Sequence, residues 1–174
     1  MLEIRKASEA DLDDVCRMYD EIIDSTEGKE CSPLWTKGVY PNRDYFRGTI
    51  ERGELYLAFC DGCIAGGVVR NHRQADGYGD VPWDAAASPA EVYTIHTLGV
   101  HPAFQHRNIA TEISRRVIDD ARKDGMKAIR LDVIDGNYPS VLLYRRMGFT
   151  DHGQHILHYE GMDDIPFTMM ELVL

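Results

Sequence analysis

Cysteine is scarce in this sequence, and neither a long hydrophobic run nor an excess of basic residues is present. Four cysteines are too few for a disulfide scaffold, and they fit a reducing compartment. No apolar run approaches the length of a membrane span, and the N-terminal stretch MLEIRKASEADL is too polar for a signal peptide. Together these absences predict a cytoplasmic protein.

Acidic residues outnumber basic ones, which gives a formal net charge of −10 at pH 7. Nucleic acids and anionic membranes both need a basic surface, so neither is an expected partner. The charge is compatible with a cationic substrate such as an amine, although acidic residues also serve solubility alone. With 174 residues, 44% hydrophobic and 28% charged, the chain fits one globular domain that spans residues 1–174.

The sequence contains only weak signals for a metal-binding site. Cys60 and Cys63 flank Asp61-Gly62, the expected two-residue turn of a β-hairpin. A zinc site would need a second pair of cysteines or histidines at similar spacing, and none is evident. A C-terminal histidine triplet recurs at every third residue, which divides its members between the two faces of a strand (His152, His155 and His158). We therefore expect no metal.

The pattern of apolar residues predicts a mixed α/β chain without repeats or low-complexity segments. Strands are expected at residues 2–6, 55–60, 64–71, 91–100, 128–134, 152–159 and 167–173. Ser8, with Asp11 in a capping-box position, begins a helix whose apolar residues run from Leu12 to Ile23. Further helices are expected at residues 42–52, 107–123 and 140–147, and no regular element is expected in the polar segment 72–90.

The stretch GVHPAFQHRNIATEIS, residues 99–114, reads as a strand end, a turn and a helix start. Such an arrangement points several backbone N–H groups at one spot, and the helix dipole favours an anion there. Asn108 and Ala110 stand where phosphate cradles usually carry glycine. Asparagine tolerates the left-handed region best after glycine, and alanine is nearly as small. Side-chain donors are added by Arg107, His101 and His106, although a capped structural helix explains these residues equally well.

A series of further residues continues this pattern toward the C-terminus: Leu98, Val100, Pro102, Gln105, Ala110, Asn137, Leu143, Tyr144, Gly148 and Phe149. In this order the chain resembles the GNAT superfamily of acyl-CoA N-acyltransferases. The family pattern is an L-x-V-x-P strand, a loop Q/R-x-x-G-x-G/A that enters a helix, a strand, an asparagine and a helix with L-Y-x-x-x-G-F. The likeness covers essentially the whole chain, and the departure is Asn108 at the first loop glycine.

The resemblance implies an α/β fold with a central twisted, mostly antiparallel sheet, a splayed parallel strand pair and helices on both faces. It also implies acetyl-CoA as the cofactor, with coenzyme A as product. The backbone of Leu98, Gly99 and Val100 would bind the pantetheine arm, which Asn137 would also contact. The diphosphate would be cradled by Gln105, His106, Arg107, Asn108, Ile109 and Ala110.

The same resemblance implies transfer of an acetyl group to a primary amine by direct attack in a ternary complex. A backbone N–H near Leu98 would face the developing oxyanion. Tyr144 would lie beside the sulfur and protonate the departing thiolate, although a packed core aromatic is its alternative. His96, on one strand face with Thr94 and Leu98, is a base candidate of suitable intrinsic pKa or else a structural histidine. Glu91 could act through water, or serve surface solvation.

Trp35 and Tyr40 occupy the segment where this family builds its acceptor pocket, so they are expected to contact a small-molecule or peptide amine. Ordinary packing explains these aromatics equally well, as it does Asp80, Trp83 and Asp84 at the same mouth. A second hypothesis is a non-catalytic acyl-CoA sensor or scaffold. A nucleotide-binding protein is excluded because its glycine-rich motifs are missing. Paired C-terminal strands are compatible with a homodimer.

Overall fold

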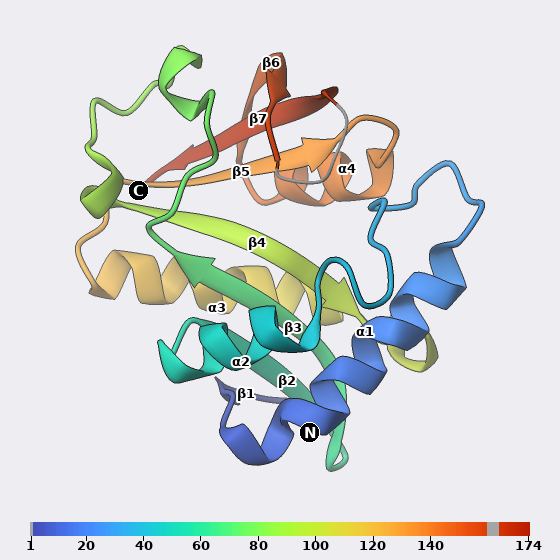
Figure 1. Cartoon of the computed structure of the whole chain (residues 1–174). Helices are drawn as coiled ribbons and strands as arrows, with labels where there is room; N and C mark the ends of the chain where they lie inside the picture. The colour runs from blue at the N-terminus through green and yellow to red at the C-terminus, as the bar shows by residue number, and fades with distance from the viewer. Residues whose placement is uncertain (1, 160–163) are drawn as a thin grey trace. The chain divides into compact units, whose positions relative to one another are not determined.

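The computed structural model describes residues 2–159 and 164–174, whose strands form a seven-stranded sheet in the order β1-β2-β3-β4-β5-β7-β6 (Figure 1). The strands β4 and β5 pair in parallel through Val92–Thr94 and Ala128–Arg130. The pairs β1–β2, β2–β3, β5–β7 and β6–β7 are antiparallel. The expected α/β fold class, with a mostly antiparallel sheet and one parallel pair, is confirmed.

The elements lie close to their expected positions. The strands are β1 (Leu2–Lys6), β2 (Leu55–Cys60), β3 (Cys63–Asn71), β4 (Val92–Val100), β5 (Ala128–Ile134), β6 (Thr150–Leu157) and β7 (Ile165–Val173). The helices are α1 (Leu12–Thr26), α2 (Arg43–Glu51), α3 (Ile109–Lys123) and α4 (Tyr138–Arg146). Short 3₁₀ turns are η1 (Glu9–Asp11), η2 (Tyr78–Asp80), η3 (Pro89–Glu91) and η4 (Pro102–Phe104). Within the described residues, no helix combines the length and apolar character that a membrane crossing requires.

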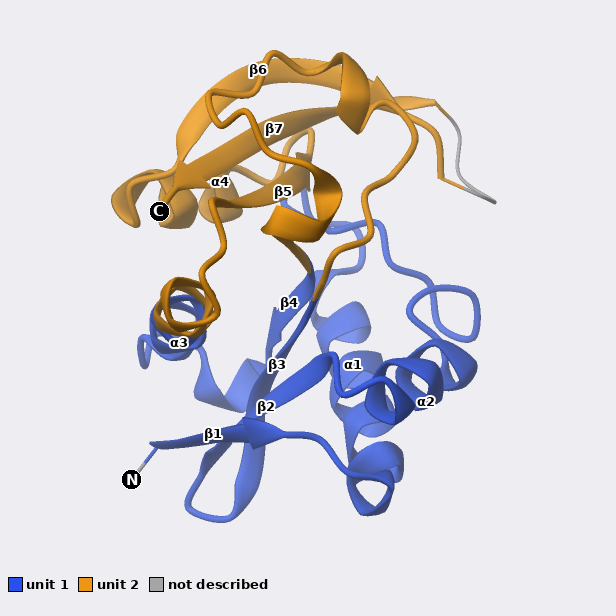
Figure 2. Cartoon of the chain, turned by 90° about the vertical axis from the view of Figure 1, so that its left-hand side faces the viewer, with its two compact units in different colours: residues 1–70, 96–116 blue, residues 71–95, 117–174 orange. Residues whose placement is uncertain are grey.

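The chain divides into two compact units, shown in two colours in Figure 2. Unit 1 comprises Met1–Arg70 and His96–Arg116, and unit 2 comprises Asn71–Ile95 and Val117–Leu174. The strand β4 and the helix α3 each contribute residues to both units. The loop that precedes α3 therefore belongs to unit 1, whereas α4 belongs to unit 2.

Unit 1 is organised around the apolar face of α1, which begins after a capping box formed by Ser8 and Asp11. All the apolar residues expected on this face are buried, because their helical spacing places them on one side. They pack with Phe46 of α2 and with apolar residues of β2 and β3. The expected members of the buried face are Leu12, Val15, Met18, Tyr19, Ile22 and Ile23.

Two adjacent glycines in β3 allow helices to approach both faces of the strand closely. A Cβ atom at Gly67 would lie 3.2 Å from the Tyr19 hydroxyl, and one at Gly66 would lie 3.1 Å from Ile113 Cδ1. Because consecutive strand residues point to opposite faces, α1 covers one face of β3 and the start of α3 covers the other. Unit 1 thus has helices on both faces of its strands.

The hairpin between β2 and β3 turns at Asp61-Gly62, as expected. Both turn residues have positive φ, +51° at Asp61 and +84° at Gly62, which suits the tight two-residue turn. Cys60 and Cys63 are paired directly across this turn, and both are free thiols. The spacing of these cysteines is therefore accounted for by the hairpin.

Unit 2 buries part of the segment 72–90, for which no regular element was expected. This segment contains η2 and part of η3, and it places Tyr78 and Val81 in a core with residues of β5, β6 and β7. The expectation was wrong because the glycines and prolines of the segment indicated a loop, although Tyr78 and Val81 within it are buried. Gly77, at φ +101°, starts the turn that brings Tyr78 inward.

Among the boundaries that differ from expectation by one or two residues, three have a clear local reason. Glu91 belongs to η3 and not to β4, because its side chain caps the turn at Ser88. Helix α3 begins at Ile109 and not at residue 107, because Asn108 has a left-handed conformation. Helix α4 begins at Tyr138, with a proline in its first turn, where proline is favoured.

Candidate functional site

The loop between β4 and α3 takes the shape that its sequence suggested. His106 and Asn108 lie in the left-handed region, with φ of +62° and +60°. Asparagine adopts this region more readily than most residues, so Asn108 can substitute for glycine in the backbone geometry. The Asn108 carbonyl accepts from the N–H of Glu112 at 3.0 Å, which fixes it at the start of α3. The residues of the loop apex are exposed: Gln105, His106, Arg107 and Asn108.

The N-terminus of α3 offers hydrogen-bond donors to a ligand at this loop. The first N–H groups of a helix have no partner within the helix, and its dipole makes this end positive. The Arg107 guanidinium lies 5.4 Å from the Phe104 ring centroid. His101 is already engaged, because its Nδ1 accepts from the Ala103 N–H and its Nε2 lies 3.0 Å from Glu21 Oε2. Backbone groups, together with the exposed side chains of Arg107 and His106, are therefore the donors that the loop offers an anion.

The strand segment before this loop is irregular. Thr97 has φ +47°, and the alternation of buried residues along β4 shifts by one position between Thr94 and Ile95. Strict alternation had predicted that Thr94, His96 and Leu98 lie on the same face of the strand. The shift means that Thr94 does not share the face of His96 and Leu98. Leu98 and Val100 are half-buried, whereas Gly99 is buried.

Gly99 is needed for the packing of this segment against α1. A Cβ atom at Gly99 would lie 2.9 Å from Ile22 Cδ1 and 3.1 Å from the Tyr19 ring. Both distances are shorter than ordinary carbon contacts. The helix α1 therefore lies directly against the backbone of β4 at this point.

The two base candidates have different surroundings. His96 is half-buried in β4 within unit 1. Glu91, in unit 2, lies 2.6 Å from Lys127 Nζ and accepts from the N–H and the hydroxyl of Ser88 at 2.9 Å. The hydrogen bond from Lys127, followed by those from Ser88, lowers the pKa of Glu91 to about 2. A carboxylate held in this way is a weak base.

Tyr144 is buried in unit 2, with 4% of its surface exposed, and its ring packs edge-on against Phe149 at 5.2 Å. Burial, and to a lesser degree the charge of Asp132, raises the pKa of Tyr144 well above its usual value. The phenol therefore stays protonated at neutral pH. Among the described residues its hydroxyl has no hydrogen-bond partner, which leaves the proton available.

Asn137 is the N-cap of α4 in unit 2. Its side-chain oxygen accepts from the N–H of Ser140 at 3.4 Å. This capping contact uses the oxygen and not the amide nitrogen. The Asn137 side chain can therefore hold α4 and still donate a hydrogen bond.

The loop between α1 and α2 in unit 1 contains both expected acceptor residues. Trp35 lines a pocket of about 540 Å³, together with Leu34 and residues at the end of α1. Its ring also packs against Tyr19, with centroids 5.6 Å apart. Tyr40 packs edge-on against Tyr45 at 5.1 Å and is not among the residues that line this pocket.

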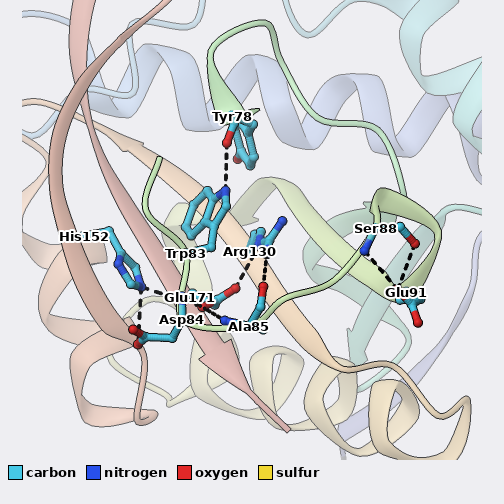
Figure 3. Close-up of polar contacts among 9 residues, drawn as sticks. All are labelled: Tyr78, Trp83, Asp84, Ala85, Ser88, Glu91, Arg130, His152 and Glu171. Carbon is cyan, nitrogen blue, oxygen red and sulfur yellow. Dashed lines mark hydrogen bonds and ion pairs between the residues drawn. The ribbon is translucent and has the colours of Figure 1, made fainter. Parts of the chain in front are cut away.

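In unit 2 the structure brings Asp84, His152 and Glu171 together, a cluster that sequence reasoning missed (Figure 3). Their candidate ligand atoms all lie within 4.8 Å of one another. His152 Nε2 lies 3.7 Å from Asp84 Oδ2 and 3.8 Å from Glu171 Oε2, and among the residues that the structure describes this buried nitrogen has no hydrogen-bond partner. The sequence signal that could have indicated this cluster is Glu171, a charged residue within the apolar C-terminal strand.

The contacts of Glu171 favour an anchoring role for this cluster over metal binding. Its Oε1 accepts from Arg130 Nε at 2.9 Å, and its Oε2 accepts from the N–H groups of Asp84 and Ala85 at 2.8 and 3.0 Å. Three donors already occupy this carboxylate, and the adjacent guanidinium repels a cation. The Trp83 ring covers Arg130 at 4.7 Å, so Trp83 and Asp84 are part of the same anchor. Asp80 is exposed.

Comparison with known proteins places these features in a family. Residues 16–149 match the model of the acetyltransferase (GNAT) family. The chain is 33% identical over 82 residues to the N-alpha-acetyltransferase RimI of Mycobacterium tuberculosis, covering 47% of this chain and 50% of that protein. It is 27% identical over 150 residues to a protein of Methanocaldococcus jannaschii named as an uncharacterized N-acetyltransferase, covering 85% of this chain and 60% of that protein. The chain thus spans only about half to three fifths of these relatives.

Solved structures are similar over nearly the full length. A GNAT-family acetyltransferase from Streptococcus agalactiae has a TM-score of 0.80 at 18% identity, covering 99% of this chain and 95% of that one. The yncA protein of Salmonella typhimurium, solved with its cofactor acetyl-CoA, has a TM-score of 0.73 at 20% identity, covering 100% and 94%. These likenesses concern the fold. Because the family model covers most of the sequence, including the loop at Asn108 and the helix with Tyr144, the chain belongs to the acetyltransferase (GNAT) family.

Proposed function

We propose that this protein is an N-acetyltransferase that transfers the acetyl group of acetyl-CoA to a primary amine of a small molecule or peptide. The observation that carries the proposal is the exposed loop with left-handed His106 and Asn108 immediately before α3. Family membership supports it, as do two relatives named N-acetyltransferases and a structural neighbour solved with acetyl-CoA. We further propose that residues 1–174 act as one N-acetyltransferase domain.

The loop residues have the chemistry that a diphosphate requires. Backbone N–H groups of residues 105–110, the helix dipole and the exposed Arg107 would hold the diphosphate of coenzyme A. The backbone of Leu98, Gly99 and Val100 would hydrogen-bond the pantetheine arm, and the amide of Asn137 would donate to it. Acetyl-CoA supplies an activated thioester, and the chain supplies orientation and proton transfer.

Acyl transfer requires a neutral amine, a stabilised oxyanion and a protonated leaving thiolate. An ammonium group with a pKa of about 10.4 is almost fully charged at pH 7, so a base is needed. We favour His96 over Glu91 for this role, because Lys127 and Ser88 hold the Glu91 carboxylate. The Leu98 N–H would stabilise the oxyanion, and the buried, protonated Tyr144 would protonate the thiolate. The amine would attack directly, with no covalent enzyme intermediate.

The pocket beside Trp35 supports a cationic acceptor. Asp24, Glu27 and Lys37 are the charged residues among the described residues that line this pocket, and Lys37 pairs with Asp24 at 2.6 Å. Two carboxylates against one ammonium leave the pocket negative. The aromatic ring of Trp35 in the pocket wall adds cation–π attraction for an alkylammonium group, and Tyr40, which does not line this pocket, would contact the acceptor only beyond it.

A non-catalytic acyl-CoA-binding module is the second candidate, because the buried packing of Tyr144 against Phe149 also suits a structural residue. A thiol-release assay separates the two. Acetyl-CoA is incubated with the protein and a panel of alkylamines, polyamines and peptides with free N-termini. Amine-dependent release of coenzyme A supports the enzyme, and binding of acetyl-CoA without release supports the module.

Size-exclusion chromatography tests the homodimer, and cell fractionation tests the cytoplasmic location.

A further inference from the structure

The most unusual backbone conformation in unit 1 is that of Thr97 in β4. Its φ of +47° lies in the left-handed region, which a β-branched residue enters rarely. The other residues near this site with positive φ are His106 and Asn108, whose types tolerate it better. A conformation of this kind persists only where the surrounding structure imposes it. Unit 1 must therefore contain contacts that hold Thr97.

Those contacts come from two tyrosines on different helices. The Tyr19 hydroxyl of α1 donates to the Thr97 carbonyl oxygen at 2.6 Å, and Tyr19 is only 1% exposed. The Tyr45 hydroxyl of α2 lies 3.3 Å from Thr97 Oγ1. The rings of both tyrosines pack on Phe46, with centroids 4.6 and 5.4 Å away, so the two hydroxyls are held firmly in place.

The hydrogen bond to Thr97 has a consequence for the next residue. The Thr97 carbonyl and the Leu98 N–H belong to one planar trans peptide, so they point in opposite directions. Because Tyr19 draws the carbonyl toward α1, the Leu98 N–H is turned to the side of β4 away from Tyr19. Gly99 also favours this orientation of the peptide, because a glycine has no side chain and α1 can therefore lie directly against the strand.

We propose that Tyr19 is a positioning residue that clamps the Thr97–Leu98 peptide and thereby aims the Leu98 N–H at the oxyanion of acyl transfer. The inference rests on the proposed function. Tyr19 touches neither the acyl donor nor the amine in this account and acts only through the peptide. The burial that raises the pKa of Tyr19 keeps its hydroxyl a donor across the pH range of an assay.

Tyr19→Phe tests the clamp because it keeps the ring packing and removes only the hydroxyl. We expect kcat to fall about tenfold or more, with KM for acetyl-CoA changed less than about twofold, because loss of a full oxyanion donor costs about 10²-fold or more. The control is Tyr93→Phe, which removes a tyrosine hydroxyl that donates to Asp124 at 2.7 Å in unit 2. It should leave kcat unchanged.

Thr97→Gly distinguishes a positioning role of Tyr19 from a purely structural one, because only a positioning role makes the effect of Tyr19→Phe depend on residue 97. Glycine enters the left-handed region without steric cost, so the peptide should need the clamp less. We expect Tyr19→Phe to lower kcat several-fold less in the Thr97→Gly background than in the native one. Equal losses in both backgrounds, or an unchanged kcat in Tyr19→Phe, would overturn the proposal.

Backbone chemical shifts of Thr97 distinguish failure of the clamp from failure of the proposed function. If the native protein turns over no amine, the proposed function fails, and the Thr97 shifts in Tyr19→Phe still report its conformation. Shifts that leave the left-handed range in Tyr19→Phe support the clamp. Shifts that stay as in the native protein contradict it, whatever the activity.

Discussion

Arg130 and Glu171 form an ion pair inside unit 2, with 2.9 Å between Arg130 Nε and Glu171 Oε1 and only 5% and 0% of the two side chains exposed (Figure 3). The same two residues bind the backbone of the segment 72–90. Glu171 accepts from the N–H groups of Asp84 and Ala85, and Arg130 Nη2 donates to the Ala85 carbonyl at 2.9 Å. The pair therefore connects this segment to β5 and β7.

Replacing Arg130 by methionine should strongly destabilise the protein. The substitution leaves the Glu171 carboxylate buried without its ionic partner, which costs about 3–5 kcal/mol. Urea denaturation measures the change in the free energy of unfolding. The matched control is Arg145→Met, which breaks an exposed pair with Asp151 and should cost at most about 1 kcal/mol. Similar losses in both variants would contradict the anchoring role of Glu171.

Asp11 should make stability depend on acidic pH. The hydrogen bond from Arg5, supported by contacts from Ser8, lowers the pKa of Asp11 well below its usual range. Its contribution is therefore fully present above the ordinary carboxyl pKa of about 3.9 and is lost as the pH falls below that value. Urea denaturation from pH 7 to pH 2 should show the difference in stability between native protein and Asp11→Asn shrinking below about pH 4.

The control for this prediction removes the partner instead of the carboxyl. Arg5→Met takes away the largest cause of the lowered pKa and should flatten the acid dependence. A difference between the native protein and Asp11→Asn that stays constant down to pH 2 would exclude the proposed linkage.

Tyr144→Phe should separate catalysis from folding. Loss of a general acid typically lowers the rate by about 10²-fold or more, whereas KM for acetyl-CoA should change little. Release of coenzyme A with an active amine provides the measurement. Tyr138→Phe alters an exposed tyrosine on the same helix and should be silent. An equal kcat in both variants would assign Tyr144 to packing alone.

His96→Gln and Glu91→Gln should differ in the same assay. We expect the His96 variant to lose most of its kcat. The Glu91 variant should keep its kcat and unfold more easily, because it loses the contacts with Ser88 and Lys127. Since the pKa of Glu91 is about 2, its charge does not change between pH 5 and pH 9. A large loss of kcat in Glu91→Gln, with the stability unchanged, would reverse the assignment.

Local sequence predicted the elements whose stabilising contacts are close in the chain. The apolar spacing of α1, the Ser8–Asp11 capping box and the Asp61-Gly62 turn each depend on a few neighbouring residues. Asn108 belongs to this group, because its tolerance of positive φ is a property of the residue type. The motif residues of the loop and of α4 could therefore be placed on the right elements.

Features that depend on distant residues could not be predicted in this way. The anchoring of segment 72–90 depends on Glu171, which follows it by more than 80 positions. The left-handed Thr97 depends on Tyr19, 78 residues earlier, and contradicts the preference of a β-branched residue. In both cases a tertiary hydrogen bond overrides what the local sequence favours.

Thermal unfolding with acetyl-CoA tests the central claim, that the loop at Asn108 holds the diphosphate of coenzyme A. A ligand at about 100 times its Kd adds roughly 2.7 kcal/mol, and each kcal/mol raises Tm by about 2–4 °C in a chain of this size. We expect a rise of several degrees in the native protein and in Asn108→Gly, and a smaller one with ADP. Asn108→Val, which resists the left-handed region, should show little or none. No rise in the native protein at saturating acetyl-CoA would contradict the account.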